Sequence, residues 1–254
     1  MNGFVNLLNF RDLGGIKVAD GRAVRPRRLL RAALPVGLSE GDVSALRGYD
    51  LRHIVDFRTV EEVADSPVDR IDGVTYTHID IMGENEAQAA CPKFWMELFE
   101  KNPNGVVDEF TRTYKEFSTG QTSTDGYSKF IKSLCKAEGA TLFHCTAGKD
   151  RTGYAAALLL RILGINESDF IDDYLKSLEY QRKIHSTHVD KAKKRGLSDE
   201  QIEKMGVIFN VNESYIHAAF QAAEETYGSF EGYVKDGLKL SEGDIAQLME
   251  GYLE

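Results

Sequence analysis

The chain has 254 residues, of which 42% are hydrophobic and 28% charged, and its formal net charge is −9. This composition excludes a wholly disordered chain and supplies enough apolar residues for a large buried core. The acidic balance argues against non-specific nucleic-acid binding, which needs concentrated Lys and Arg. The three cysteines, at positions 91, 135 and 145, are odd in number and have no metal-ligand spacing, which argues against a disulfide scaffold.

The beginning of the sequence lacks the basic start and long apolar run of a secretory signal. The longest apolar run, at 154–160, is far shorter than the ~20 residues that span a bilayer. These features predict a cytoplasmic protein without an integral membrane segment, although export without a recognisable signal stays an alternative.

The first half of the sequence alternates strand and helix patterns. Residues 16–24 fit a small hairpin around Asp20-Gly21, and residues rich in β-branched and aromatic types at 52–57, 74–81 and 141–145 predict strands. Helix-spaced apolar residues fill 94–117 and 127–134. This alternation predicts an α/β fold with a mostly parallel central sheet flanked by helices.

The second half of the sequence reads as helices from Asn166 onward, with no linker rich in Pro, Gly or Ser before it. We therefore predict a single domain over residues 1–254, made of an α/β core at 1–165 and a helical C-terminal extension at 166–254. The polar stretch 186–206 is a candidate lid over a site, but an ordinary exposed helix has the same composition.

The most informative stretch is 141–153, which reads T-L-F-H-C-T-A-G-K-D-R-T-G. It predicts an apolar strand, a glycine-containing loop and a buried helix. A strand-to-helix loop gathers consecutive backbone N–H groups and a helix N-terminus around one small volume, which favours an anion such as phosphate. The predicted phosphate-binding residues are Thr146, Ala147, Gly148, Lys149, Asp150 and Arg151.

Each end of this loop carries a group suited to phosphate-ester hydrolysis. Cys145 opens the loop, where electropositive surroundings would hold a nucleophilic thiolate. Arg151 closes it, and a guanidinium can clamp two phosphate oxygens and follow the charge into the transition state. Thr152 could donate its hydroxyl to the sulfur as it leaves a phosphocysteine.

Three other interpretations of the loop fit less well. A nucleotide-binding P-loop needs a glycine where Phe143 stands and a Ser or Thr where Asp150 stands. A rhodanese-like sulfur carrier has a tighter loop between Cys and Arg. An isolated, buried structural cysteine would leave Gly148 and Arg151 without a reason for their spacing.

The segment His144–Gly153 resembles the Cys-x5-Arg signature of the protein-tyrosine-phosphatase superfamily. More narrowly, it is similar to the broad-specificity bacterial and fungal tyrosine phosphatases, whose loop contains Gly-Lys-Asp-Arg-Thr. The resemblance implies a tyrosine-phosphatase fold, a phosphocysteine intermediate, and neither a metal nor another cofactor. Further similar segments are Asn9–Gly15, Arg25–Ala32, Val55–Arg58 (with Phe57 where Leu is usual), Asp173–Ser177 and Tyr227–Ser229.

The general acid has more than one candidate. The resemblance makes Asp150 a proposed acid, although the cations on either side of it favour its ionised form and oppose proton donation. Asp56 is the other main candidate, because strand C-termini line the ligand crevice of an α/β sheet. It could equally form a salt bridge with Arg58, and Asp80 or Asp125 could also serve.

Three further residues are candidate accessory groups. His144 is expected to orient the loop by hydrogen bonding rather than to act directly. Arg58 is the expected ion-pair partner of Asp56. Arg11, like Asp12, is more often part of a structural ion pair than of a catalytic site.

Lys149 is the residue that bears on substrate range. A lysine at this position also occurs in phosphoinositide phosphatases, but their second lysine, directly after the cysteine, is replaced here by Thr146. Protein phosphotyrosine is therefore the main predicted substrate, with phosphoserine, phosphothreonine and phosphoinositides as additional candidates. The alternatives are a phytase-like inositol-polyphosphate phosphatase and a phosphate-binding module without turnover.

Two clusters of basic residues could contact an anionic substrate or the surface of a membrane. The other interpretation is a solvated face balanced by nearby acids, and no nucleic-acid partner is expected. The first cluster contains Arg25, Arg27, Arg28 and Arg31, and the second contains Lys191, Lys193, Lys194 and Arg195.

Overall fold

The computed structural model describes residues 4–83, 87–194 and 210–254, together with residues 196, 198–200, 202, 206 and 208. At the centre of this described part is a five-stranded sheet with the order β1-β2-β5-β3-β4. β1 is antiparallel to β2, and the other neighbouring pairs are parallel, which confirms the predicted α/β fold. The strands are β1 (Arg11–Asp12), β2 (Leu29–Ala32), β3 (Leu51–Asp56), β4 (Thr75–His78) and β5 (Ala140–His144).

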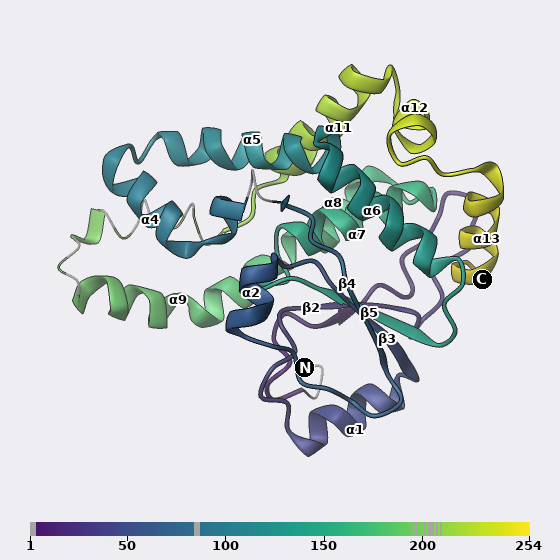
Figure 1. The fold of residues 1–254 in the computed structure, drawn as a ribbon, viewed down its shortest axis with the longest axis horizontal. Coiled ribbons are helices and arrows are strands. Elements are labelled where there is room, and N and C mark those ends of the chain that lie inside the picture. Colours follow the sequence, from purple (N-terminus) through teal and green to yellow (C-terminus); the bar gives the residue numbers. More distant parts are fainter. Residues whose placement is uncertain are drawn as a thin grey trace.

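Helices cover both faces of the sheet, with α1 on one face and a larger set on the other (Figure 1). None of the described helices is long and apolar enough to cross a membrane. The helical segments are α1 (Glu40–Gly48), α2 (Val60–Asp65), η1 (Ala87–Ala90), α4 (Pro92–Lys101), α5 (Gly105–Thr119), α6 (Gln121–Leu134), α7 (Arg151–Ile162), α8 (Glu167–Leu175), α9 (Ser177–Lys194), α11 (Glu213–Tyr227), α12 (Phe230–Gly232), the π-helical turn η2 (Tyr233–Gly237) and α13 (Glu242–Tyr252).

The central strands alternate between two apolar layers. Leu142 and Ile54 belong to the layer that includes Leu46 of α1, whereas their neighbours Phe143 and Val55 belong to the layer under the larger helical set. This two-residue period follows from the pleat of a strand, which sends successive side chains to opposite faces. Because both faces are covered, the C-terminal end of β5 is one of the places where a loop can open toward a ligand.

The helical pattern at 94–117 forms two helices rather than one. α4 ends at Lys101 and α5 begins at Gly105, so the predicted run is interrupted at 102–104. Asn102 has the extended conformation φ −152°, ψ 83°. The residue before a proline is pushed out of the helical region by the proline ring, and Pro103 follows Asn102.

β2 was hidden in the sequence by its charge. Leu29–Ala32 lie in a segment that we read as basic, yet all four residues are buried. The Arg31 guanidinium forms an ion pair of 2.6 Å with Asp173 in α8, which allows a charged residue inside a central strand. The predicted hairpin at 16–24 is present as a short pairing: Lys17 and Ala23 form an antiparallel bridge, and backbone hydrogen bonds join Val18 to Arg22 and Val24 to Ile16.

Helices from the second half of the chain pack directly on the first half. The Ser118 hydroxyl of α5 donates to the Ala219 carbonyl of α11 at 2.7 Å, and Tyr252 donates to the Leu134 carbonyl at 3.0 Å. In the predicted lid, residues 186–194 form the end of α9, while residues 195, 197, 201 and 203–205 lie outside the described residues.

The aromatic packing beneath the end of β3 gives a first testable prediction. Phe57 is fully buried, 5.0 Å from the ring of Phe130 and 5.9 Å from that of Tyr127. We expect Phe57→Ala to lower the free energy of unfolding by about 3–5 kcal/mol, because the smaller side chain loses these ring contacts and leaves a cavity. Urea unfolding measures this change. The exposed control Val60→Ala should stay within about 0.5 kcal/mol of wild type, and an equally small change for Phe57→Ala would contradict the packing.

Candidate active site

The predicted phosphate loop lies between the end of β5 and the start of α7. Cys145 follows the last strand residue and is only 2% exposed, and the helix begins at Arg151. Gly148 adopts φ +63°, and a Cβ on it would lie 2.2 Å from the carbonyl oxygen of Ala32. A side chain at this position would therefore be both strained and blocked. The loop can pack closely against β2 because residue 148 is glycine.

The carbonyl oxygens of residues 145–148 all accept hydrogen bonds. Because the carbonyl and the following N–H of a trans peptide point in opposite directions, the N–H groups of residues 146–149 are turned to the other side. Within the described part of the chain, no hydrogen bond uses these four donors. The donors to the carbonyls are His144 Nδ1 to Cys145 (3.0 Å), Leu34 N–H to Thr146 (3.1 Å), Asn9 Nδ2 to Ala147 (3.0 Å) and to Gly148 (3.1 Å), and Arg31 to Gly148 (3.0 Å). Such a row of N–H groups is an anion-binding surface.

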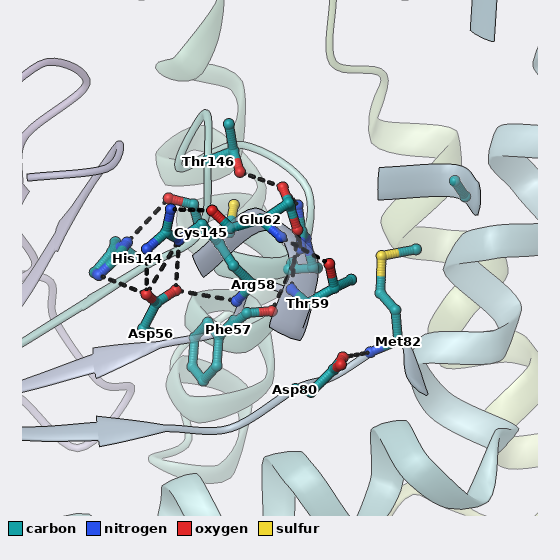
Figure 2. Close-up of polar contacts among 12 residues, drawn as sticks. Asp56, Phe57, Arg58, Thr59, Glu62, Asp80, Met82, His144, Cys145 and Thr146 are labelled. Atoms are coloured by element: carbon teal, nitrogen blue, oxygen red, sulfur yellow. Dashed lines mark hydrogen bonds and ion pairs between the residues drawn. The ribbon is translucent and has the colours of Figure 1, made fainter. Parts of the chain in front are cut away.

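Arg151 forms a bidentate ion pair with a carboxylate that the sequence did not point to. Both nitrogens at the end of its guanidinium bind Glu62 of α2, at 2.6 and 3.0 Å. Glu62 also accepts from the backbone N–H of Thr59 at 3.0 Å and from the Thr146 hydroxyl. Figure 2 shows Glu62 beside Thr146 and Cys145. In the sequence, the only signal is the helix capping box Thr59-x-x-Glu62, which gives no hint of a second partner.

The Glu62–Arg151 ion pair stabilises the charged form of both side chains and leaves one edge of the guanidinium for a ligand. Burial alone would lower the pKa of Arg151, but the hydrogen bonds and charge of Glu62 raise it instead. Burial likewise opposes ionisation of Glu62, yet Arg151 brings its pKa down to about 2. Glu62 occupies the terminal fork, so the edge formed by Nε and the outer hydrogen of one terminal nitrogen can take two phosphate oxygens.

Asp150 is held by a chain of two buried tyrosines. The Tyr114 hydroxyl donates to its Oδ1 at 2.9 Å, and the Tyr174 hydroxyl lies 2.7 Å from that of Tyr114. Burial raises the pKa of Tyr114, so this hydroxyl keeps its proton and remains a donor. The ammonium of Lys149 lies 3.6 Å from the other carboxylate oxygen. Asp150 is thus fixed at the wall of the loop.

Asp56 is enclosed by Arg58. Its oxygens accept from Nε at 2.9 Å and from a terminal nitrogen at 2.7 Å, and Oδ1 also accepts from the Arg58 backbone N–H at 3.0 Å. Burial would raise the pKa of Asp56, but these hydrogen bonds hold it below its usual value. His144 lies 3.8 Å away, and burial lowers its pKa, so the ring is neutral. This arrangement matches the ion pair considered for Asp56.

The two other acid candidates are engaged elsewhere. Asp80 caps a turn by accepting from the backbone N–H groups of Met82 and Gly83, and Figure 2 shows it on the Met82 side, apart from the loop. Asp125 is half exposed and forms an ion pair of 3.1 Å with Lys239.

Lys149 and Thr152 are both buried, but their polar atoms differ in their partners. The Lys149 ammonium donates to the carbonyls of Ile208 and Asn210, at 2.9 and 3.3 Å, and lies 5.3 Å from the ring centre of Phe110. Thr152 is fully buried, and its hydroxyl has no hydrogen-bond partner among the residues that the structure describes.

Most of the first basic cluster is used inside the fold. Arg25 donates to the Leu253 carbonyl at 2.9 Å, Arg28 donates to the Ala137 carbonyl at 3.1 Å, and Arg31 pairs with Asp173. These three arginines therefore form neither an open basic surface nor a solvated face balanced by acids. In the second cluster, Lys193 forms an exposed ion pair with Asp199, and residue 195 lies outside the described residues.

A cavity of about 310 Å³ opens over the loop. Cys145 and Arg151 lie at its polar end, and Thr146, Ala147, Lys149 and Asp150 also line it. Its remaining wall is rich in aromatic side chains. These are Trp95, Phe110, Tyr114, Phe117 and Tyr180. The ring centres of Trp95 and Phe110 are stacked 3.9 Å apart. The arrangement can bind a phosphate at one end and an aromatic group beside it.

Comparison with known proteins agrees with this geometry. The sequence model described as the tyrosine phosphatase family matches residues 3–254. The chain belongs to this family. It is 32% identical, over 98% of its length and 87% of the relative, to a Cupriavidus necator protein that carries the name of a tyrosine-protein phosphatase. It is 28% identical, over 90% of both chains, to the triple specificity protein phosphatase PtpB of Mycobacterium tuberculosis.

A third relative, a tyrosine-protein phosphatase of Nostoc commune, is 30% identical over 83% of this chain and 69% of its own. Membership of the tyrosine phosphatase family makes this protein a cysteine-based phosphatase, an enzyme that acts on phosphorylated substrates.

The Glu62–Arg151 pair gives a second prediction. We expect Glu62→Gln to lower kcat/KM by about 10- to 100-fold, because a charged hydrogen bond worth about 1.5–3 kcal/mol is lost from Arg151 while the helix cap keeps an acceptor. Steady-state kinetics with an aryl phosphate measures this. Glu61→Gln, an exposed neighbour, is the matched control. Tighter phosphate binding by Glu62→Gln would instead mean that Glu62 competes with the substrate.

The sign of the pH dependence follows from the lowered pKa of Glu62. Its usual value is 4.5 and its value in the fold is about 2. The stability that the pair contributes is therefore complete above the usual value and is lost only as the pH falls through about 2. Wild type and Glu62→Gln should accordingly have pH profiles of the same shape above about pH 5, differing in height alone.

Proposed function

We propose that this protein hydrolyses phosphotyrosine in proteins through a phosphocysteine intermediate at Cys145. The observation that carries the proposal is the row of N–H groups at residues 146–149, which have no hydrogen-bond partner among the described residues and face one side of the loop that Cys145 opens and Arg151 closes. These donors and the guanidinium match the charged, non-bridging oxygens of a phosphoryl group. The relatives' names support the same chemistry.

Two steps account for the reaction. In the first, the Cys145 thiolate attacks phosphorus, the S–P bond forms, and the P–O bond to the tyrosine breaks while Asp150 gives its proton to the leaving phenolate oxygen. In the second, water attacks phosphorus, Asp150 takes a proton from it, and the S–P bond breaks to release inorganic phosphate. Arg151 balances the charge in both steps, and the Thr152 hydroxyl, which has no partner among the described residues, donates to the departing sulfur.

We assign the acid to Asp150 rather than Asp56. Asp150 lines the cavity and has a fixed position beside Tyr114, whereas both oxygens of Asp56 are bound by Arg58. In this assignment Asp56 orients Arg58 and supports the end of β3. The Lys149 ammonium lies 3.6 Å from one oxygen of Asp150, and Tyr114 donates to the other, so the carboxyl group is held in one orientation.

The cavity favours an aryl phosphate. Its aromatic wall suits the ring of phosphotyrosine, whereas the polar hydroxyls and extra phosphates of an inositol ring would lose hydration against it. The Lys149 ammonium, the one feature that pointed to phosphoinositides, is already bonded to two backbone carbonyls. The name of the M. tuberculosis relative supports testing more than one phosphoester class as additional substrates.

The expected location follows from the cysteines. We propose a reducing, cytoplasmic compartment, on the odd number and the spacing of Cys91, Cys135 and Cys145 in the sequence.

The third prediction tests the nucleophile and the substrate together. Wild type should hydrolyse a small aryl phosphate and a phosphotyrosine peptide in EDTA, and Cys145→Ser should fall to background. A phosphoinositide and an inositol polyphosphate are run beside them. A preference for the inositol polyphosphate would favour the phytase-like alternative, and tight phosphate binding without turnover would favour a phosphate-binding module.

The fourth prediction separates the two acid candidates. We expect Asp150→Asn to reduce kcat by about 10²- to 10⁴-fold for a phenol that leaves poorly and far less for one that leaves without protonation. Asp56→Asn should reduce both rates to the same extent, because it disturbs Arg58 and not proton transfer. Turnover of a series of aryl phosphates measures the difference. A steep dependence on the leaving group in Asp56→Asn, with a flat one in Asp150→Asn, would reverse the assignment.

A further inference from the structure

A strained asparagine lies against the outer side of the phosphate loop. Asn9, just before β1, has φ +52°, in the left-handed region that Asn tolerates better than most side chains. Its side-chain nitrogen donates to the carbonyls of Ala147 and Gly148, at 3.0 and 3.1 Å. One amide from the N-terminal segment therefore bridges two successive peptide groups of the loop.

The orientation of this amide is fixed by its other end. Arg11 donates to Asn9 Oδ1 at 2.7 Å, so the oxygen faces Arg11 and the nitrogen faces the loop. Arg11 is itself held by the Asp173 carboxylate at 2.9 Å and by the Ser177 hydroxyl at 3.0 Å. Asn9 thus has one hydrogen-bonding arrangement available to it.

Asp173 supports the loop by a second route as well. Its other oxygen binds Arg31 at 2.6 Å, and a further nitrogen of Arg31 donates to the Gly148 carbonyl at 3.0 Å. Burial would raise the pKa of Asp173, but the charges of Arg31 and Arg11 hold it below its usual value, so this carboxylate stays ionised. The buried Asp173 carboxylate therefore binds Arg31, which contacts the loop directly, and Arg11, which orients Asn9.

The direction of the loop carbonyls decides the direction of the next N–H groups. Fixing the Ala147 carbonyl turns the Gly148 N–H to the opposite side, and fixing the Gly148 carbonyl does the same for the Lys149 N–H. We propose that Asn9 is a positioning residue for phosphate: its amide aims the N–H donors of Gly148 and Lys149 at the phosphoryl oxygens. This inference rests on the proposed function of the loop, but it concerns binding and not turnover.

The proposal predicts a particular kinetic pattern. The two N–H donors contact non-bridging oxygens in the bound substrate and in the transition state alike. Misdirecting them removes uniform binding, which raises KM and leaves kcat nearly unchanged. A merely structural role for Asn9 would lower the fraction of folded enzyme, and hence the apparent kcat, without changing KM.

Two substitutions test the inference while keeping the backbone conformation. Asn9→Gly removes the amide and accepts positive φ without strain. Asn9→Asp keeps the size and the tolerance for positive φ, but it places an oxygen against two carbonyl oxygens. The matched control is Asn6→Gly in the same segment, because the Asn6 amide also donates to a backbone carbonyl, that of Gly37, but in an exposed place.

Titration calorimetry with inorganic phosphate and with vanadate is the main measurement, with urea unfolding and KM alongside. We expect about 10-fold weaker binding for Asn9→Gly, more for Asn9→Asp, and wild-type binding for Asn6→Gly. Wild-type affinity and KM in Asn9→Asp would overturn the role of Asn9 and leave the proposed function intact. Absence of phosphate and vanadate binding in the wild type itself would overturn both.

Discussion

The direction of four peptide groups is the constraint on which the site depends. Residues 145–148 turn their carbonyls toward partners in the surrounding fold, and the N–H groups that follow them gather on the opposite side. The partners come from three strands or their flanks: His144 ends β5, Arg31 lies in β2 with Leu34 just after it, and Asn9 precedes β1. The sheet order puts β2 directly beside β5, which brings these donors to the loop. Donors on the outer side of the loop thus fix its carbonyls, and this orients the N–H groups of the anion site.

The second constraint is the cost of burying charge. Arg31, Arg58 and Arg151 are all nearly inaccessible to solvent, and a buried charge without a partner is strongly destabilising. Each has a carboxylate within 2.7 Å: Asp173 for Arg31, Asp56 for Arg58, and Glu62 for Arg151. In this way an acidic chain maintains a cationic site. Arg151 keeps a free edge for ligand because its carboxylate binds the far end of the guanidinium.

The sequence predicted the parts of the molecule that local chemistry controls. The strand, loop and helix at 141–153 follow from a run of apolar residues broken by one glycine, and the parallel sheet follows from alternating periods. Contacts between distant segments left no comparable trace. Asn9 and the Ala147 carbonyl are 138 residues apart, and Arg31 and Asp173 are 142 apart. The only local pattern at Glu62 is a helix capping box, and β2 contains a charged residue, Arg31, whose distant partner leaves no mark in the sequence. Local sequence pattern therefore could not predict which polar groups pair across long distances in the chain.

The central claim is that the loop forms a covalent bond to phosphorus at Cys145. Rapid acid quenching of the enzyme during turnover of an aryl phosphate, followed by mass spectrometry of its peptides, tests this most directly. The account predicts one phosphoryl group on the peptide that contains Cys145, at a level approaching one per chain, and its disappearance as the substrate is consumed. A burst of phenol with no phosphoryl group on that peptide, or with the group on another residue, would contradict it.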